Sequence, residues 1–376
     1  MPTEKTWNEN ILRLTTEIRE KNPELLTFLN EMPETLPDKE KPSLHLKALE
    51  AYYDSLVALQ QGYEDKHANN VVIPSPIPDP FAEPVPEVLD AYPNIMLDVN
   101  DMRLSYNDVG TASIPIVFLH GFPFDKSMWQ AQLTCLKNTQ RAIAYDIRGF
   151  GKSTGEKTHL SIPLFATDLI AFMDELKIKK AILCGLSMGG FIALNAIKRF
   201  PERFEALILC DTQCIADTPE VKKNRLTAIQ QINRDGAATF NEKFVKSIFH
   251  PDSLTDKTAL VEGLRQVIFA NTKDIITAGL TALAERSETC STLAAIRVPT
   301  LLICGRADKV TPLSESEFMH AHIEGAHLKI IENAGHVSNL EQPAAFNAHI
   351  MEFLAPIDTN KYVEPNSEPL CPKVEV

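Results

Sequence analysis

The chain has few basic residues for its length. Its 376 residues include 37 Lys and Arg against 50 Asp and Glu, which gives a net charge of −13. Phosphate backbones and anionic membrane surfaces are bound by clustered Lys and Arg, and the sequence has no extended basic patch. We therefore expect neither nucleic acid nor a membrane as a partner.

Long apolar runs and paired cysteines are also scarce. No stretch of about 18 apolar residues occurs, and the first residues, "MPTEKTWNEN", have neither a cationic segment nor an apolar one. The seven cysteines are few and irregularly spaced, without CxxC, and Cys184, Cys210 and Cys304 end apolar runs, where a reduced cysteine packs as a small hydrophobe. These features favour a reducing, cytoplasmic location.

The beginning of the chain differs in composition from the rest. Residues 1–70 are charged with a helical apolar spacing, as at Trp7, Ile11 and Leu14, and predict a helical appendage. Residues 71–94 are rich in proline and predict an extended linker. Short amphipathic helices need a partner surface, so the appendage could dock on the main domain or form a homodimer.

The remainder alternates short apolar runs with helical patterns. Near-continuous apolar runs are typical of parallel strands covered on both faces, so residues 95–211 and 297–356 predict the two parts of an α/β fold with a mostly parallel, doubly wound sheet. Residues 212–296 have helical patterning and predict a helical insertion that forms a cap over the sheet. Residues 357–376 are polar and predict a tail. The predicted strands are "IPIVFLH", "RAIAYD", "KAILCG", "EALILCD", "PTLLICG" and "LKIIEN".

The stretch "CGLSMGG" places a serine between a predicted strand and a predicted helix. Gly185 and Gly189 have no Cβ, so a strained turn can expose the Ser187 hydroxyl above the sheet. The following helix begins with unpaired N–H groups and the positive end of its dipole, which suit a developing oxyanion. Ser187 is therefore the candidate nucleophile, against the alternative of an ordinary turn serine.

A nucleophilic serine needs a base, and the base needs a carboxylate that orients it. In the chain order Ser, acid, His, Asp308 follows the strand "TLLICG", and His336 lies in the loop "ENAGHVSN". Asp211 also ends a strand and is the rival acid, with capping of the chain as its alternative role. His120 is a weaker rival base.

The turn "HGFP" supplies the other half of the predicted site. The N–H of Phe122 and the N–H of Met188 are the expected oxyanion donors. His120, Phe124 and Trp129 are predicted to line the substrate pocket. For the aromatic residues, ordinary core packing is an equal alternative.

Six stretches in this order and spacing resemble the α/β-hydrolase superfamily, especially its small esterases, enol-lactonases and cofactor-free perhydrolases. The resemblance covers about residues 95–355 and implies a Ser187–Asp308–His336 triad, the two amide donors, and no metal or organic cofactor. It implies a small-molecule ester or lactone substrate cleaved through an acyl-enzyme. There are two alternatives: a perhydrolase that uses peroxide in place of water, and a non-catalytic ligand-binding module. The stretches are "HGFPFDKSMW", "YDIRGFGKS", "GLSMGGFIAL", "RFPERFEALILCDT", "GRADKVTP" and "AGHVSNLEQPAAFN".

Overall fold

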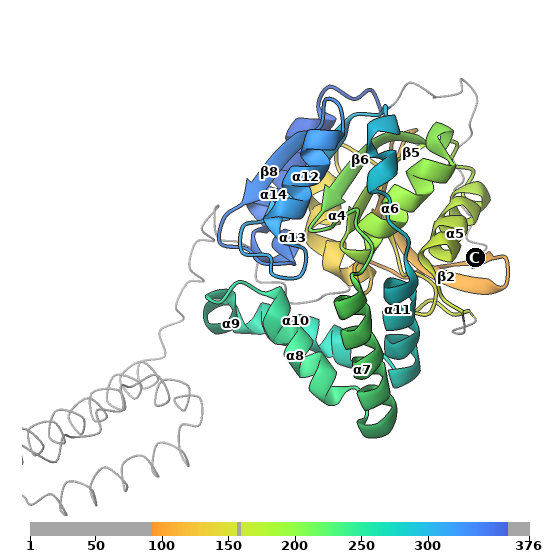
Figure 1. Cartoon of the computed structure of the whole chain (residues 1–376). Helices are drawn as coiled ribbons and strands as arrows, with labels where there is room; N and C mark the ends of the chain where they lie inside the picture. Colours follow the sequence, from red (N-terminus) through yellow and green to blue (C-terminus); the bar gives the residue numbers. More distant parts are fainter. Residues whose placement is uncertain (1–91, 156–158, 360–376) are drawn as a thin grey trace, which may run out of the picture. The chain divides into compact units, whose positions relative to one another are not determined.

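The computed structural model describes residues 92–155 and 159–359. The predicted appendage and linker, and nearly all of the predicted tail, lie outside these residues. An eight-stranded sheet in the order β1-β2-β4-β3-β5-β6-β7-β8 forms the centre (Figure 1). The strands are β1 (Ile95–Val99), β2 (Met102–Val109), β3 (Ile116–Leu119), β4 (Ala142–Tyr145), β5 (Ala181–Leu186), β6 (Phe204–Cys210), β7 (Thr300–Gly305) and β8 (His327–Ile331).

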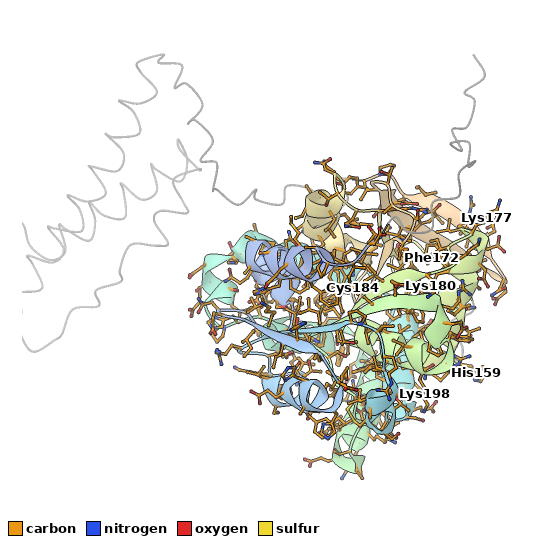
Figure 2. The ribbon with its side chains drawn as sticks, turned by 90° about the horizontal axis from the view of Figure 1, so that it is seen from above. His159, Phe172, Lys177, Lys180, Cys184 and Lys198 are labelled. Atoms are coloured by element: carbon orange, nitrogen blue, oxygen red, sulfur yellow. A yellow bond between two sulfur atoms is a disulfide. The ribbon has the colours of Figure 1, made fainter. Side chains whose placement is uncertain are left out.

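Both faces of the sheet are buried, and this explains the apolar runs. Along β5, Ala181 and Leu183 pack in the core on one face, and Ile182 and Cys184 pack in the core on the other. Figure 2 shows Cys184 among the packed side chains and the exposed Lys177 at the edge of the molecule. Strands β3 to β8 are parallel, which confirms the predicted α/β class.

The first two strands differ from the prediction of regular alternation from residue 95. β1 and β2 form an antiparallel hairpin, and β2 pairs with β4, also antiparallel. Their sequences, "IMLDV" and "MRLSYNDV", are partly polar because β1 is an edge strand with exposed positions. Edge strands of this kind give a weaker apolar signal than strands buried on both faces.

Helices cover both faces of the sheet (Figure 1). Helices α5, α6 and α12 contribute to one core cluster, and α4 and α14 contribute to the other. The helices are α4 (Gln130–Leu136), α5 (Ile162–Glu175), α6 (Met188–Arg199), α7 (Pro219–Asp235), α8 (Ala238–Ile248), α9 (Ser253–Asp256), α10 (Thr258–Phe269), α11 (Lys273–Glu285), α12 (Leu313–His322), α13 (Ser338–Glu341) and α14 (Pro343–Leu354), with 3₁₀ helices η2 (Lys126–Trp129), η3 (Pro201–Arg203) and η4 (Cys290–Ala295).

The segment between β6 and β7 consists of helices α7 to α11 and η4. Helix α7 packs against α11, and α8 packs against α10 (Figure 1). Buried Ile232 of α7 and Ile276 of α11 join one core cluster, and Val245 of α8 and Ile268 of α10 join the other. We call residues 212–296 the helical insertion. Its action as a substrate cap stays a prediction.

Cys214 and Cys290 form a disulfide, so the expectation of reduced cysteines is wrong for this pair. The two residues are far apart in the sequence, and only the fold brings them together, so their spacing gave no signal. Cys184, Cys210 and Cys304 are free and buried, as predicted. Disulfides are typical of oxidising compartments, so this bond does not support the predicted cytoplasmic location, which stays a prediction.

Within residues 92–155 and 159–359, none of the helices is by itself long and apolar enough to cross a membrane. Helices α10 and α11, bent by 93° at the break between them, meet the length and composition criteria only as a pair.

Candidate active site

Ser187 occupies a strained turn between β5 and α6. Its φ of 55° is unusual for a residue with a side chain. A Cβ at Gly185 would lie 2.3 Å from the Gly189 carbonyl oxygen, and a Cβ at Gly189 would lie 2.1 Å from the Leu119 carbonyl oxygen. Neither contact is possible for a real side chain, so the turn requires both glycines, as the sequence predicts. Ser187 thus lies directly after the last residue of β5 and directly before the first residue of α6.

The structure brings the three predicted triad residues together. His336 Nε2 lies 2.8 Å from Ser187 Oγ, and His336 Nδ1 lies 2.8 Å from Asp308 Oδ2. Asp308 follows β7 and His336 follows β8, so the three groups meet at the carboxyl edge of the parallel sheet. All three residues are buried, with Ser187 8% exposed and His336 1% exposed. This chain of contacts can move a proton away from Ser187.

Asp308 is held as a carboxylate by several donors. The N–H groups of Val310 and Thr311 donate to Oδ1 at 2.8 and 3.0 Å, and the Thr311 hydroxyl donates to Oδ2 at 2.7 Å. Burial alone would raise the pKa of Asp308, but His336 and Thr311 outweigh burial and lower it. Thr311 therefore supports the carboxylate; it lies in the motif "GRADKVTP", in which only Asp308 was predicted as a site residue.

The ionised Asp308 determines how His336 carries its protons. A carboxylate accepts only, so Nδ1 of the imidazole is the donor and Nε2 is free to accept the proton of Ser187. Burial alone would lower the pKa of His336, but the charge and hydrogen bond of Asp308 outweigh it and raise the pKa above its ordinary value. An imidazolium at His336 would thus be stabilised by Asp308.

Asp211, the rival acid, has different partners. Its Oδ1 accepts the Gly305 N–H at 2.7 Å, and its Oδ2 contacts the Ser338 hydroxyl at 2.5 Å. Burial raises the pKa of Asp211 well above its usual value, and the charge of Asp308 raises it further. Asp211 therefore links the end of β7 to the start of α13.

Another buried carboxylate, Glu341, positions the loop that carries His336 and was not predicted. Its two oxygens accept the N–H of Gly335 at 2.6 Å and the N–H of His250 at 2.7 Å. The His336 N–H donates to the Ile248 carbonyl at 2.7 Å. The loop that carries His336 is therefore tied to the end of α8 in the helical insertion. The motif "SNLEQP" contains Glu341, for which no role was predicted.

The two predicted oxyanion donors lie at the starts of their elements. Met188 is the first residue of α6, where a backbone N–H has no partner within the helix. Phe122 follows β3 in the turn "HGFP". In the described ranges, neither N–H has a hydrogen-bond acceptor. Both amides are therefore available to a ligand, and their role as donors stays a prediction.

Both ring nitrogens of His120 have hydrogen-bond partners within the protein. Nδ1 lies 2.8 Å from the Gly121 carbonyl oxygen, and Nε2 accepts the Ile147 N–H at 2.9 Å. The ring is fully buried, and burial lowers the pKa of His120 despite its hydrogen bond to Gly121. His120 thus fastens the turn to the end of β4 and is not placed to serve as the base.

The contacts of Phe124 and Trp129 agree with the alternative of core packing. The Trp129 ring lies 4.8 Å from that of Phe118 and 6.2 Å from that of Phe346, and it is fully buried. Phe124 is also fully buried and lies 6.1 Å from Phe244 of α8. Their predicted role as pocket walls stays a prediction.

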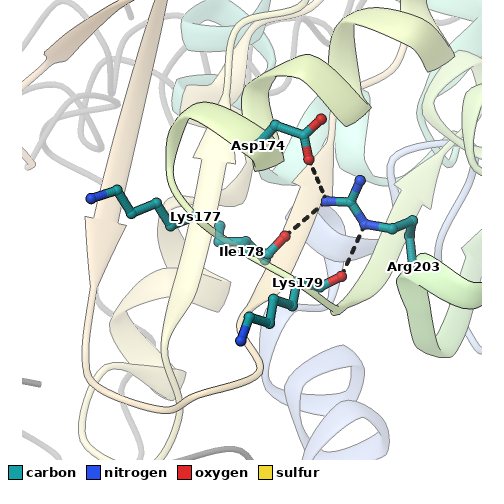
Figure 3. A pocket seen from close by; sticks show the side chains of 5 residues that line it. All are labelled: Asp174, Lys177, Ile178, Lys179 and Arg203. Atoms are coloured by element: carbon teal, nitrogen blue, oxygen red, sulfur yellow. Dashed lines mark hydrogen bonds and ion pairs between the residues drawn. The ribbon is translucent and has the colours of Figure 1, made fainter. Parts of the chain in front are cut away.

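A surface hollow of about 420 Å³ lies away from these groups (Figure 3). It is lined by residues that precede β5 and β6, so it is at the amino edge of the sheet. Arg203 donates there to Asp174 Oδ1 at 2.7 Å and to the backbone carbonyls of Ile178 and Lys179. The hollow therefore contains a structural tie between α5 and the 3₁₀ helix η3.

Known proteins resemble the chain over this same region. A family model described as the alpha/beta hydrolase fold matches residues 114–343, and this range contains every predicted site residue. The 3-oxoadipate enol-lactonase 2 of Acinetobacter baylyi is 32% identical over 257 residues, which are 68% of this chain and 94% of that protein.

Two further comparisons cover similar shares of the chain. A thermophilic esterase from Thermogutta terrifontis has a solved structure with a TM-score of 0.68 and 30% identity, covering 71% of this chain and 100% of that one. A putative non-heme chloroperoxidase of Synechocystis sp. is 29% identical, covering 66% of this chain and 94% of that protein.

Proposed function

Because the chain belongs to the α/β-hydrolase fold family, we propose that it is a serine hydrolase that cleaves a carboxylic ester or a lactone through an acyl-enzyme on Ser187. The observation that carries this proposal is the continuous contact from Ser187 Oγ through His336 to Asp308, with 2.8 Å at each step. Small-molecule esters and lactones are the proposed substrate class.

In the acylation step, Ser187 Oγ attacks the carbonyl carbon of the substrate while His336 Nε2 takes the hydroxyl proton. The amides of Phe122 and Met188 donate to the oxygen that becomes negatively charged. His336 then gives its proton to the departing alcohol, or to the ring oxygen of a lactone. The products of this step are the acyl-enzyme and the free hydroxyl group.

In the deacylation step, water takes the place of the alcohol. His336 removes a proton from the water, the hydroxide attacks the acyl carbon, and the bond to Ser187 Oγ breaks as the serine recovers its proton. Asp308 keeps Nδ1 of the imidazole protonated throughout and stabilises the transient cation. The N–H and the hydroxyl of Thr311 both donate to Asp308. The carboxylate is therefore already in position beside His336 before the reaction begins.

The relatives favour two related activities. An enol-lactonase and an esterase cover about two thirds of this chain or more, which supports ester or lactone hydrolysis. The similarity to a putative non-heme chloroperoxidase supports a second candidate, in which hydrogen peroxide replaces water at the acyl-enzyme and a peracid is released. Pocket walls set such preferences more than the triad does.

A fluorophosphonate probe tests the proposed nucleophile. Intact-mass analysis should show one adduct on the full chain and none on Ser187→Ala, and hydrolysis of p-nitrophenyl acetate by this variant should fall by about 10⁶-fold. A circular dichroism spectrum like that of the wild type is the control for folding. If the wild type is not labelled, Ser187 is not an active nucleophile, and the alternative of a non-catalytic ligand-binding module is favoured. Peracid formation from acetate and hydrogen peroxide distinguishes the second candidate.

A further inference from the structure

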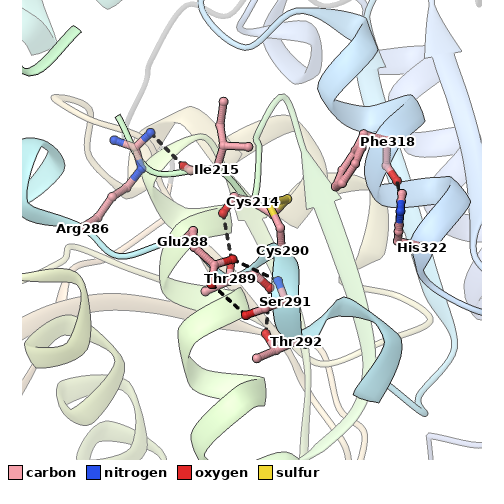
Figure 4. Close-up of a disulfide and its surroundings, with 10 residues drawn as sticks. All are labelled: Cys214, Ile215, Arg286, Glu288, Thr289, Cys290, Ser291, Thr292, Phe318 and His322. Carbon is pink, nitrogen blue, oxygen red and sulfur yellow. Dashed lines mark hydrogen bonds between the residues drawn. A yellow bond between two sulfur atoms is a disulfide. The ribbon is translucent and has the colours of Figure 1, made fainter. Parts of the chain in front are cut away.

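The two ends of the helical insertion are joined covalently. Cys214 follows β6, and Cys290 begins η4 ahead of β7, at a sequence separation of 76. Figure 4 shows their disulfide where the two connecting segments run side by side. Cys214 is 2% exposed, whereas Cys290 is partly exposed. The bond therefore closes the insertion at its base and is accessible from the Cys290 side.

Noncovalent contacts join the same two segments. The Thr289 N–H donates to the Cys214 carbonyl at 2.8 Å. Arg286 donates to Asp217 Oδ1 at 2.5 Å and to the Ile215 carbonyl at 3.2 Å, and both charged side chains are 2% exposed. We call Cys214, Asp217, Arg286, Thr289 and Cys290 the stem. Its buried ion pair needs both partners in place.

The stem also contacts the helix that follows the nucleophile. The Arg286 guanidinium lies over the Phe191 ring, 4.4 Å from its centre. Phe191 is one turn along α6 from Ser187, and its N–H donates to the Ser187 carbonyl at 3.2 Å. On α11, Gly279 lies against the Phe122 ring, which a Cβ would approach to 2.6 Å. The position of the insertion is thus coupled to both sides of the candidate active site.

We propose that Cys214–Cys290 is a redox-sensitive clamp that fixes the helical insertion on α6, and that its reduction by a dithiol loosens α7 and α11 and changes which esters the site accepts. This inference rests on the proposed function and adds a mode of regulation to it. The triad itself lies on β5, β7 and β8 and contains none of the clamp residues. Reduction should therefore affect substrate choice more than bond cleavage.

The reduction balances as a thiol–disulfide exchange. One thiolate of the dithiol attacks Sγ of the more accessible Cys290, and Cys214 leaves as a thiolate that takes up a proton. The second thiolate of the reductant then attacks the mixed disulfide and releases Cys290. Two electrons pass from the dithiol, which becomes a cyclic or intramolecular disulfide, to the protein, which gains two thiols.

The test compares the oxidised full chain with the same chain treated with dithiothreitol and desalted under nitrogen. Thiol alkylation and mass analysis verify that two thiols have formed. Amide hydrogen exchange in α7 and α11 should accelerate by about tenfold or more, because a long closed loop restrains the chain. The KM of p-nitrophenyl octanoate should rise by about fivefold or more, while kcat/KM for the acetate changes by less than about twofold.

Two variants serve as matched controls. Cys214→Ser/Cys290→Ser should behave like the reduced protein and ignore dithiothreitol, and Cys135→Ser, which alters a free cysteine, should respond like the wild type. Equal exchange rates and equal octanoate KM in both redox states would overturn the clamp. Fluorophosphonate labelling in both states separates the two proposals, because a failure to label overturns the proposed function while the exchange data still decide the clamp.

Discussion

The ends of two neighbouring strands, β6 and β7, each place an aspartate near the same histidine, yet the two side chains have different partners. Asp308, after β7, contacts His336 Nδ1 at 2.8 Å. Asp211, after β6, contacts the Gly305 N–H and the Ser338 hydroxyl. Burial raises the pKa of Asp211, whereas the contacts of Asp308 overcome burial and lower its pKa.

This difference shows that the partners of a carboxylate decide its role more than its place at a strand end does. Asp308 stays ionised because His336 and Thr311 donate to it. Asp211 is neutral over a wider pH range, because the nearby negative charge of Asp308 disfavours a second one. Asp211 ties two segments together, and its charge contributes less to the raised pKa of His336 than the charge and hydrogen bond of Asp308 do.

The largest expected effect is on kcat, when each of the two aspartates is replaced by the uncharged asparagine. Asp308→Asn should lower kcat for p-nitrophenyl acetate by about 10⁴-fold, because an amide nitrogen facing Nδ1 favours the wrong tautomer of His336. Asp211→Asn should stay within about tenfold of the wild type, because the amide oxygen can accept the Gly305 N–H and the amide nitrogen can donate to the Ser338 hydroxyl oxygen once that hydroxyl turns. Steady-state kinetics on the two purified variants measure this. The reverse ranking would mean that Asp211 is the acid of the triad.

The free energy of unfolding tests whether Asp211 has a structural role. Asp211→Ala removes both hydrogen bonds and leaves the buried Gly305 N–H without an acceptor, so the free energy of unfolding should fall by about 2 kcal/mol or more. Urea denaturation gives this value. Asp211→Asn is the matched control, with an expected loss below about 1 kcal/mol. Equal losses in the two variants would show that the contacts of Asp211 contribute little.

The pH dependence of kcat/KM should differ between the same variants. His336 acts as a base only when it is neutral, and its pKa is raised, so activity should fall as the pH drops through that raised value. Asp308→Asn removes the main cause of the increase, so the acidic limb should move to lower pH. Asp211→Asn should move it less. A larger shift in Asp211→Asn would contradict the assignment of charge to Asp308.

The smallest effect concerns the support of Asp308. Thr311→Val keeps the shape of the side chain but removes the hydroxyl that donates to Asp308 at 2.7 Å. One lost hydrogen bond to a charged group predicts a decrease in kcat of about tenfold. Thr311→Ser, which keeps the hydroxyl, is the control and should retain most of the activity. Similar kcat values for Thr311→Val and Thr311→Ser would show that the Thr311 hydroxyl does not support Asp308.

The parts of the fold that follow from local chemistry could be predicted from the sequence. The parallel strands gave apolar runs because they are buried on both faces, and the Ser187 turn required glycine at 185 and 189. The remaining features depend on contacts between distant segments. The Cys214–Cys290 bond, the donors around Asp211 and the burial of Glu341 come into being only when the strands are in place, so no local pattern marked them.

The central claim is that Asp308, and not Asp211, holds the imidazole of His336. Proton NMR of the wild-type protein at a pH where His336 is protonated should show a downfield signal from a hydrogen-bonded Nδ1–H. This signal should persist in Asp211→Asn and disappear in Asp308→Asn. A signal that persists in Asp308→Asn and disappears in Asp211→Asn would contradict it.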